Sequence, residues 1–136
     1  MRYRLYPFAC KYIYCRCNVS SMIRFDPTPH LPLTPAMFQV LVALADGEKH
    51  GYAIIKEVSR RTEGKVRLRA GTLYTAIRRF VDAGLILESN ERPDPSLDDE
   101  RRRYYRLTDR GRAVAVAEAR RMAETLAQAR VKLGVL

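Results

Sequence analysis

Hydrophobic residues recur every three or four positions in four stretches of this chain, and two shorter stretches with apolar or aromatic residues flank a polar loop. The helical periodicity predicts amphipathic helices, and the two short stretches on either side of a loop predict a pair of strands. The predicted order is three helices, a two-stranded ribbon and one long helix. We expect the helices at residues 34–46, 51–61, 70–84 and 108–136, and the strands at residues 85–89 and 101–107. The predicted fold class is therefore mainly α with a small β-ribbon.

The residues that flank these stretches indicate where the helices begin and end. Thr34 is a typical N-cap, and Pro35 suits the first helical position because its missing N–H needs no partner there. Gly47 and Gly84 follow the first and third helices, and glycine readily adopts the left-handed conformation that ends a helix. The link between the second and third helices contains a short candidate strand at residues 66–68.

The third predicted helix, residues 70–84, divides its side chains between two arcs. The arc expected to face a core carries Leu73, Ile77, Phe80 and Val81. The opposite arc carries Thr72, Thr75, Arg78, Arg79 and Asp82. A strand, a polar loop at residues 90–99 and a basic strand follow this helix. Helix, strand, loop and strand in this order describe a winged helix-turn-helix domain, which we place at residues 33–107.

Length and charge narrow the possible functions. The chain has 136 residues, which allows one domain and an appendage but no second full domain. The formal net charge of +10 favours a polyanionic partner, because neutralising phosphates releases counterions. Hydrophobic residues make up 47% of the chain, yet no run approaches the roughly 18 apolar residues that a membrane-spanning helix needs. We therefore expect a cytoplasmic protein with no membrane partner.

Residues 1–32 differ from the rest of the chain and predict a disordered or extended leader. Tyrosine and cysteine are crowded early, and Pro27, Pro29 and Pro32 interrupt any regular element. Met22 lies just before the predicted domain, and we expect it to be the true start of the protein. An intact mass measured on protein from the native host would contradict this expectation if it included residues 1–21.

The last predicted helix, residues 108–136, carries an apolar seam along one side. The seam residues are seven apart in two interleaved series, as at the a and d positions of a coiled coil. They include Ala115, Ala119, Met122, Leu126, Ala129 and Leu133. The seam extends beyond one small domain, and a second copy of the chain would cover it. We expect a homodimer, with the helix folding back on the first helix of its own chain as the alternative.

Four motifs occur in order between Leu33 and Arg112. They are Leu33-Thr-Pro-Ala-Met-Phe38, Leu44-Ala-Asp-Gly-Glu-Lys-His-Gly-Tyr-Ala-Ile54, Gly71-Thr-Leu-Tyr-Thr-Ala-Ile77 and Arg101-Arg-Arg-Tyr-Tyr-Arg-Leu-Thr-Asp-Arg-Gly111. This set resembles the PadR family of winged-helix transcriptional regulators, and the single C-terminal helix is similar to that of its short subfamily. The resemblance implies a dimeric repressor that binds a palindromic operator in double-stranded DNA and is released by a small-molecule effector.

The third helix is expected to enter the major groove, because helix-turn-helix domains contact base edges through the start of that helix. Gly71 permits close approach of the backbone, and the first N–H groups of the helix suit a phosphate. The candidate contacts on this helix are Gly71, Thr72, Tyr74, Thr75, Arg78 and Arg79. Tyr52, at the start of the second helix beside His50, is a further candidate. Packing at the domain edge is the alternative role for Tyr74, and packing and capping are the alternative for His50 and Tyr52.

Three arginines at the start of the second strand are candidates for phosphate or minor-groove contact, namely Arg101, Arg102 and Arg103. Alternate side chains of a strand point to opposite faces, so Arg101 and Arg103 share one face. The same alternation directs Tyr105 and Leu107 toward the core. The alternative is a solvated charge run that pairs with the acidic residues 98–100.

Other chemistry has little support in the sequence. Cys10, Cys15 and Cys17 have no fourth ligand at zinc spacing, so we expect no metal site. The chain has two histidines, and it carries no nucleophile triad, no glycine-rich phosphate loop and no paired carboxylates. We therefore expect no enzymatic activity and no cofactor.

Three functional classes follow from these patterns. The first is a sequence-specific DNA-binding regulator, and the second is a winged-helix module that presents the same helix to a protein partner. The third is a thiol-responsive DNA-binding sensor that uses the cysteines of the leader. Release by an effector requires that the effector bind the DNA-incompetent dimer better than the competent one. Met122 and Leu126 lie in the middle of the seam and are candidates to line an effector cavity, with plain core packing as the alternative.

Overall fold

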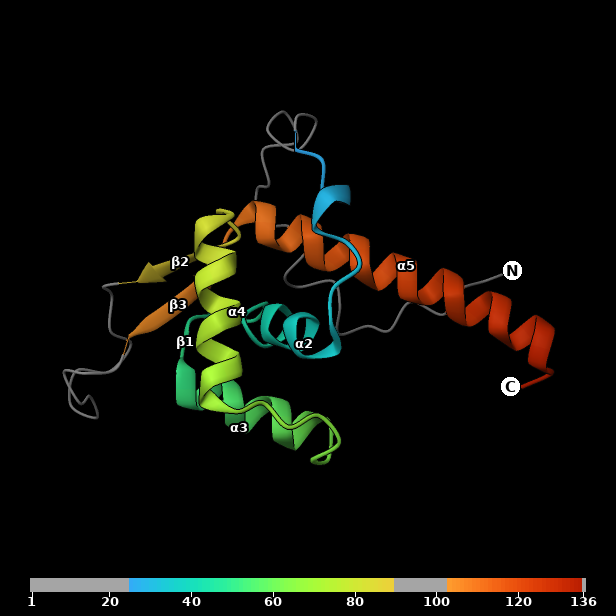
Figure 1. Ribbon diagram of the computed structural model, residues 1–136, viewed down its shortest axis with the longest axis horizontal. Coiled ribbons are helices and arrows are strands. Elements are labelled where there is room, and N and C mark those ends of the chain that lie inside the picture. Colours follow the sequence, from blue (N-terminus) through green and yellow to red (C-terminus); the bar gives the residue numbers. More distant parts are fainter. Residues whose placement is uncertain (1–24, 90–102, 136) are drawn as a thin grey trace.

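In the computed structural model, which describes residues 25–89 and 103–135, three helices precede a pair of strands and a longer helix follows it, while a further short strand of the same sheet lies between the first two helices (Figure 1). The helices are α2 (Pro35–Ala43), α3 (Gly51–Arg61), α4 (Ala70–Asp82) and α5 (Asp109–Leu133), and a short 3-10 helix, η1 (Thr28–His30), precedes α2. The strands are β1 (Lys49–His50), β2 (Ile86–Ser89) and β3 (Tyr104–Leu107). This architecture confirms the predicted fold class.

Side-chain caps fix where three of the four helices begin. Thr34, His50 and Thr108 accept hydrogen bonds from first-turn N–H groups of α2, α3 and α5 at 3.2, 3.1 and 3.0 Å. Each cap satisfies one of the N–H groups that have no partner within the helix. Arg69 precedes α4 and makes no such bond, so α4 begins without a side-chain cap.

The sheet has three antiparallel strands in the order β1-β3-β2. The prediction missed β1, because two polar residues carry no alternating pattern. The candidate strand at residues 66–68 was wrong, and this segment is irregular backbone that buries Leu68 in the core. Since β1 and β2 occupy both edges of β3, no edge of β3 remains for residues 66–68. Tyr105 points into the core from β3, as predicted.

One core lies between the helices and the inner side of the sheet. It contains Leu33, Val40, Leu41, Ala43, Leu44, Ile54, Val58, Leu68, Leu73, Ala76, Ile77, Phe80, Leu85, Ile86, Tyr105 and Val114. The prediction that Val81 belongs to this core was wrong, since 38% of this residue is exposed. At 3.6 residues per turn, Val81 lies beyond Ile77 at the edge of the apolar stripe, so it points past the core.

Residues 25–32, which fall within the predicted leader, pack against the domain. Phe25 and Leu31 are partly buried against the core. The guanidinium of Arg110 on α5 lies 5.5 Å from the centre of the Phe25 ring, and η1 contacts α5. The packed part of the chain therefore begins before residue 33. Residues 1–24, with Met22 and the three cysteines, lie outside the described residues.

The start of α5 is attached closely to the rest of the domain. The Thr108 hydroxyl lies 2.8 and 2.9 Å from the carbonyl oxygens of Gly84 and Leu85, to which it can donate. Gly111 is buried, and a Cβ atom at this position would lie 2.1 Å from the Leu85 carbonyl oxygen. Only glycine allows this approach. The helix predicted at 108–136 ends three residues earlier, at Leu133, because Gly134 takes a left-handed φ of 62°.

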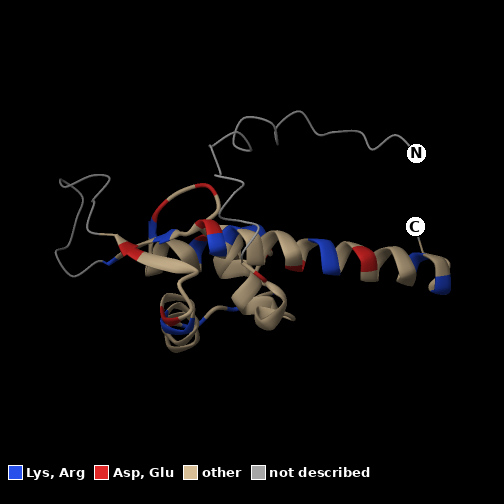
Figure 2. Ribbon diagram, turned by 90° about the horizontal axis from the view of Figure 1, so that it is seen from above, with Lys and Arg blue, Asp and Glu red and all other residues tan. Residues whose placement is uncertain are grey.

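The second half of α5 leaves the domain. Gly111, Val114 and Glu118 are the buried residues of this helix, and none beyond Glu118 is buried. The remaining turns project past α2 into open space, as both views show (Figures 1 and 2). At 1.5 Å per residue, the 15 residues from 119 to 133 extend about 22 Å.

Candidate nucleic-acid interface

α4 buries one side in the core and leaves the other side exposed to solvent. Leu73, Ala76, Ile77 and Phe80 form the buried side. The candidate DNA contacts on this helix are all exposed, namely Gly71, Thr72, Tyr74, Thr75, Arg78 and Arg79. The predicted division into two arcs is therefore correct apart from Val81. A ligand can reach these side chains without displacing any part of the core.

The first turn of α4 suits an acceptor that approaches along the helix axis. No side chain caps this turn, so its N–H groups are available to a ligand. A Cβ atom at Gly71 would meet nothing within 4 Å, which leaves room for close approach. The Thr75 hydroxyl donates to the Gly71 carbonyl oxygen at 2.8 Å. Toward a ligand, Thr75 therefore offers its methyl group and the remaining acceptor capacity of its oxygen.

Tyr74 spans the contact between α4 and α3. Its hydroxyl lies 2.9 Å from the position that a Cβ atom on Gly51 would occupy, so any larger residue at the start of α3 would displace the Tyr74 ring. The exposed fraction of Tyr74 is nevertheless 53%. Tyr74 both packs at the domain edge and presents its ring to solvent. No local pattern in the sequence indicates the role of Gly51, because the contact joins residues on different helices.

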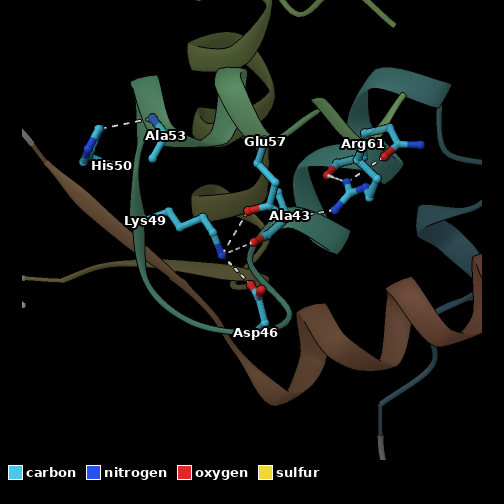
Figure 3. Close-up of polar contacts among 8 residues, drawn as sticks. Ala43, Asp46, Lys49, His50, Ala53, Glu57 and Arg61 are labelled. Carbon is cyan, nitrogen blue, oxygen red and sulfur yellow. Dashed lines mark hydrogen bonds and ion pairs between the residues drawn. The ribbon is translucent and has the colours of Figure 1, made fainter. Parts of the chain in front are cut away.

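The start of α3 carries a small group of rings beside the sheet. His50 caps α3 through its Nδ1 atom, which confirms the predicted capping role (Figure 3). The His50 ring lies edge-on to Tyr104 of β3 at 5.6 Å between centroids. Tyr52 is 57% exposed, and the Lys56 ammonium lies 4.9 Å from the centre of its ring. This pair places a phenol and a positive charge on the outer surface of α3.

The β2–β3 hairpin forms the wing and flanks one side of α4 (Figure 1). Between them lies a groove of about 220 Å³, here called the wing-side groove. It is lined by Tyr74, Ile77, Arg78, Val81, Asp82, Glu88, Arg103 and Tyr105. Burial, with a smaller contribution from Glu88, raises the pKa of Tyr105, so its hydroxyl stays protonated.

The arginines of the wing are only partly described. Arg103 is exposed, and its guanidinium lies 3.5 Å from the Glu88 carboxylate. Such an exposed pair contributes little to stability, so Arg103 can exchange Glu88 for another anion. Arg101 and Arg102 lie outside the described residues, as does the acidic loop that precedes them.

A second groove flanks the other side of α4, next to the start of α2. Its volume is about 600 Å³, and we call it the α2–α4 groove. It is lined by Thr34, Ala36, Met37, Arg69, Gly71, Thr72, Thr75, Ala76 and Arg79. Four of the predicted DNA contacts therefore belong to this groove. Arg69 and the α2 residues were not among the predicted contacts, because their proximity to α4 arises only when the helices pack.

A polar cluster beneath the interface ties α3 to α2 (Figure 3). The Lys49 ammonium donates to the Ala43 carbonyl oxygen at 2.7 Å and pairs with Asp46 and with Glu57, the latter at 3.3 Å. The hydrogen bond from Lys49 lowers the pKa of Asp46. Arg61 pairs with Glu57 at 3.0 Å and also reaches Gln39 of α2. These contacts fix the position of α3, against which α4 packs.

Comparison with known proteins agrees with this geometry. The model of the "Transcriptional regulator PadR-like family" matches residues 40–117, which is more than half of the chain. The transcriptional regulator Rv3488 of Mycobacterium tuberculosis is 39% identical over 89 residues, covering 65% of this chain and 76% of that protein. The chain belongs to the PadR-like family. It is therefore a DNA-binding transcriptional regulator, which agrees with the prediction that it is not an enzyme.

Solved structures share the fold of this PadR-like regulator. A PadR family regulator from Clostridium difficile has a TM-score of 0.62 at 23% identity and covers 74% of this chain and 99% of its own. The structure of Bacillus subtilis PadR in complex with operator DNA has a TM-score of 0.51 at 20% identity, covering 60% of this chain and 44% of its own. At these identities the likeness concerns the fold alone.

The predicted dimerisation residues of this PadR-like regulator lie in two environments. Ala115 packs partly against the core of its own chain, on the part of α5 that contacts α2. The alternative expectation, in which the last helix packs against the first helix of its own chain, therefore holds for the start of α5. Ala119, Met122, Leu126 and Leu133 are exposed and Ala129 is half-buried, on the part that projects. Neither the wing-side groove nor the α2–α4 groove is lined by Met122 or Leu126.

Glu118 is a buried carboxylate that the sequence did not predict to be functional or structural. Only 1% of this residue is exposed. Arg121 donates to both of its oxygens, at 2.7 and 2.9 Å, and the Leu33 backbone N–H also donates to it. The hydrogen bonds from Arg121 outweigh the opposing effect of burial and lower the pKa of Glu118. This carboxylate joins α5 to the segment that enters α2.

The described residues contain neither a candidate metal-binding cluster nor a candidate membrane-spanning helix. They contain no group of three or more His, Cys, Asp or Glu side chains placed to hold a metal ion. None of their helices combines the length and the apolar character that crossing a bilayer requires. Cys10, Cys15 and Cys17 lie outside the described part of the chain.

Proposed function

We propose that this PadR-like regulator is a homodimeric repressor that binds a palindromic operator and is released by a small-molecule effector. The observation that carries the proposal is the exposed arc of α4, where hydroxyls and two guanidinium groups project from a helix whose other side is buried. Arg78 can form paired hydrogen bonds with guanine, and threonine can contact a base edge or a thymine methyl. This arc is therefore equipped to distinguish base pairs.

Contacts to phosphate would position α4 in the major groove. The uncapped first turn of α4, the Tyr52–Lys56 pair on α3 and Arg103 on the wing are suited to this task. The PadR of Bacillus subtilis, which has the same fold, was solved with operator DNA. We extend this mode of binding to the present chain as part of the proposal.

The projecting half of α5 supports the homodimer. Met122, Leu126 and Leu133 are 47%, 50% and 73% exposed, and they share the seam expected of a coiled coil. A helix of this length with an apolar seam that no described part of its own chain covers is unfavourable in water. A second copy would cover the seam by two-fold symmetry, so that the dimer would match a palindromic operator.

Dimerisation through α5 also provides an element on which an effector can act. The angle between the two α5 helices would set the separation of the two α4 helices, which must match half-sites roughly 34–36 Å apart or a multiple of that distance. An effector that binds better to a dimer with another separation releases the operator. Met122 and Leu126 lie where the two seams would meet and are our candidates to contact it.

Fluorescence anisotropy tests the proposal directly. The purified chain is titrated onto a labelled duplex from upstream of its own gene and onto a scrambled duplex, at two salt concentrations. We expect binding to its own upstream DNA to be at least about 1,000-fold tighter. Equal and steeply salt-dependent binding to both duplexes would contradict sequence recognition, because it reports phosphate contacts alone. Absence of binding to either duplex would favour the protein-interaction module.

A further inference from the structure

The two grooves beside α4 differ in charge. The α2–α4 groove has two arginines, Arg69 and Arg79, and no carboxylate among its lining residues. The wing-side groove has two arginines and two carboxylates, so its formal charges cancel. Within residues 25–89 and 103–135, neither Arg69 nor Arg79 forms an ion pair or a side-chain hydrogen bond. Among the described residues that line the two grooves, the excess positive charge therefore lies on the side away from the wing.

The two grooves also lie on opposite flanks of the same helix. They share no lining residue, although α4 contributes to both. The wing extends from one side of α4 and α2 packs on the other (Figure 1). Thr72, Thr75 and Arg79 turn toward α2, whereas Tyr74 and Arg78 turn toward the wing.

The dimensions of DNA require a partner on both flanks. A helix with its side chains is about 10–12 Å wide, and the major groove is about 12 Å wide. A helix lying in that groove therefore has a sugar-phosphate strand on each side. One strand would face the wing, and the other would face the α2–α4 groove.

We propose that the α2–α4 groove receives a sugar-phosphate strand of the operator, with Arg69 and Arg79 as its phosphate ligands. This inference rests on the proposed function, because it assumes that α4 enters the major groove. The apolar floor formed by Ala36, Met37 and Ala76 lies against the sugar, and the two guanidinium groups neutralise phosphates. The stronger electrostatic attraction to DNA thus comes from Arg69, just before α4, and Arg79, in its last turn, rather than from the described strands of the wing.

The chemistry distinguishes this role from base reading. A phosphate contact contributes equally to every DNA sequence, and it releases a condensed counterion. The plot of log K against log salt has a negative slope, and loss of such a contact therefore makes that slope shallower by about 0.9 per phosphate. The preference for the operator persists. In a dimer, one substitution removes two symmetric contacts, so it makes the slope shallower by about 1.8.

The test measures salt-dependent binding of full-length Arg69→Gln, Arg79→Gln and the double variant. Each protein is titrated onto its own upstream duplex and onto a scrambled duplex between 50 and 200 mM salt. We expect each single variant to make the slope shallower on both duplexes. In the double variant, the change in slope should equal the sum of the two single changes. The ratio of the two affinities should stay within about threefold of the parent protein. Arg130→Gln, on the projecting part of α5, removes the same charge away from the groove and should leave the slope unchanged.

Three results would overturn the inference. The slope of the double variant could equal that of the parent protein, which would mean that Arg69 and Arg79 contact no phosphate and that the groove binds another ligand, such as a small anion. The affinity ratio could collapse, which would make the arginines base readers. Arg130→Gln could reduce the slope equally, which would show that only total charge matters. Failure of the proposed function is separate, because the slope on the scrambled duplex still reports the arginines when the parent protein shows no operator preference.

Discussion

The two halves of α5 belong to one continuous helix but have opposite surroundings. Residues 109–118 pack against α2 and β3 and include every buried residue of the helix. Residues 119–133 project from the domain, and Met122 and Leu126 are about half exposed. The anchored half therefore contributes to the stability of the chain, whereas the projecting half offers its apolar side to another molecule. Substitutions in the two halves should separate these two properties.

Gly111→Ala in the anchored half should have the largest effect. The added Cβ atom would lie 2.1 Å from a backbone oxygen, and backbone cannot move aside as a flexible side chain can. We expect the free energy of unfolding to fall by about 3 kcal/mol or more, measured by urea denaturation. Gly71→Ala is the matched control, because it also lies in the first turn of a helix and its Cβ atom meets nothing. Equal stability of the two variants would contradict close packing at Gly111.

Leu126→Glu in the projecting half should weaken association without unfolding the domain. A carboxylate in a seam between two helices would be buried without a partner. We expect the dissociation constant of the proposed dimer to rise at least about 100-fold, which corresponds to about 2.7 kcal/mol. Sedimentation equilibrium measures it, and Val131→Glu is the control because Val131 is 85% exposed and lies off the seam. Loss of the dimer in both variants would show that the seam is not the interface.

Glu118→Gln tests the last contact of the anchored half. The variant keeps the shape of the side chain but loses the charge that Arg121 contacts, and we expect a loss of about 1–3 kcal/mol at neutral pH. Because the pKa of Glu118 is lower in the folded state than its ordinary value of 4.5, the unfolded chain takes up this proton first. The stabilisation is therefore present above pH 4.5 and disappears as the pH falls through the folded pKa.

Urea midpoints of the parent protein and Glu118→Gln should accordingly converge as the pH is lowered from 7 to 3. The exposed Glu124→Gln supplies the control, and its midpoint should follow that of the parent protein at every pH. A difference between parent and Glu118→Gln that stays constant with pH would show that the charge of Glu118 is not what stabilises the anchored half.

Thr108→Val should have the smallest effect of the series. Valine keeps the shape of threonine but cannot accept the hydrogen bond from the Gly111 N–H or donate to the Gly84 and Leu85 carbonyl oxygens. Loss of an N-cap typically costs about 1 kcal/mol. Thermal unfolding followed by circular dichroism measures the change. Thr125→Val is the comparison in the projecting half, and a larger loss there would reverse the assignment of the two halves.

The sequence predicted what depends on neighbouring residues. Thr34 and Pro35 indicated the start of α2, and the periodicity of residues 70–82 identified the buried and exposed arcs of α4. Val81 was misplaced because a periodic pattern does not show where a packed face ends. β1 was missed because its two residues form a strand only through pairing with β3.

The contacts between distant residues could not be read from the chain. Gly51 and Gly111 are required because Tyr74 and Leu85 approach them from other elements. Glu118 looks like an ordinary surface residue of an amphipathic helix until Leu33 and Arg121 enclose it. The α2–α4 groove has the same origin, since Arg69 and Met37 meet only in the folded domain. Tertiary packing, rather than local pattern, creates each of these features.

The outer arc of α4 supports almost none of the surrounding structure. Thr72, Arg78 and Arg79 have no hydrogen bond or ion pair with other side chains in the described part of the chain. Replacing them changes the surface that meets DNA but removes no core contact. Gene duplicates of this regulator could therefore acquire new target sites through a few surface substitutions, and an engineer could retarget it while leaving the scaffold intact.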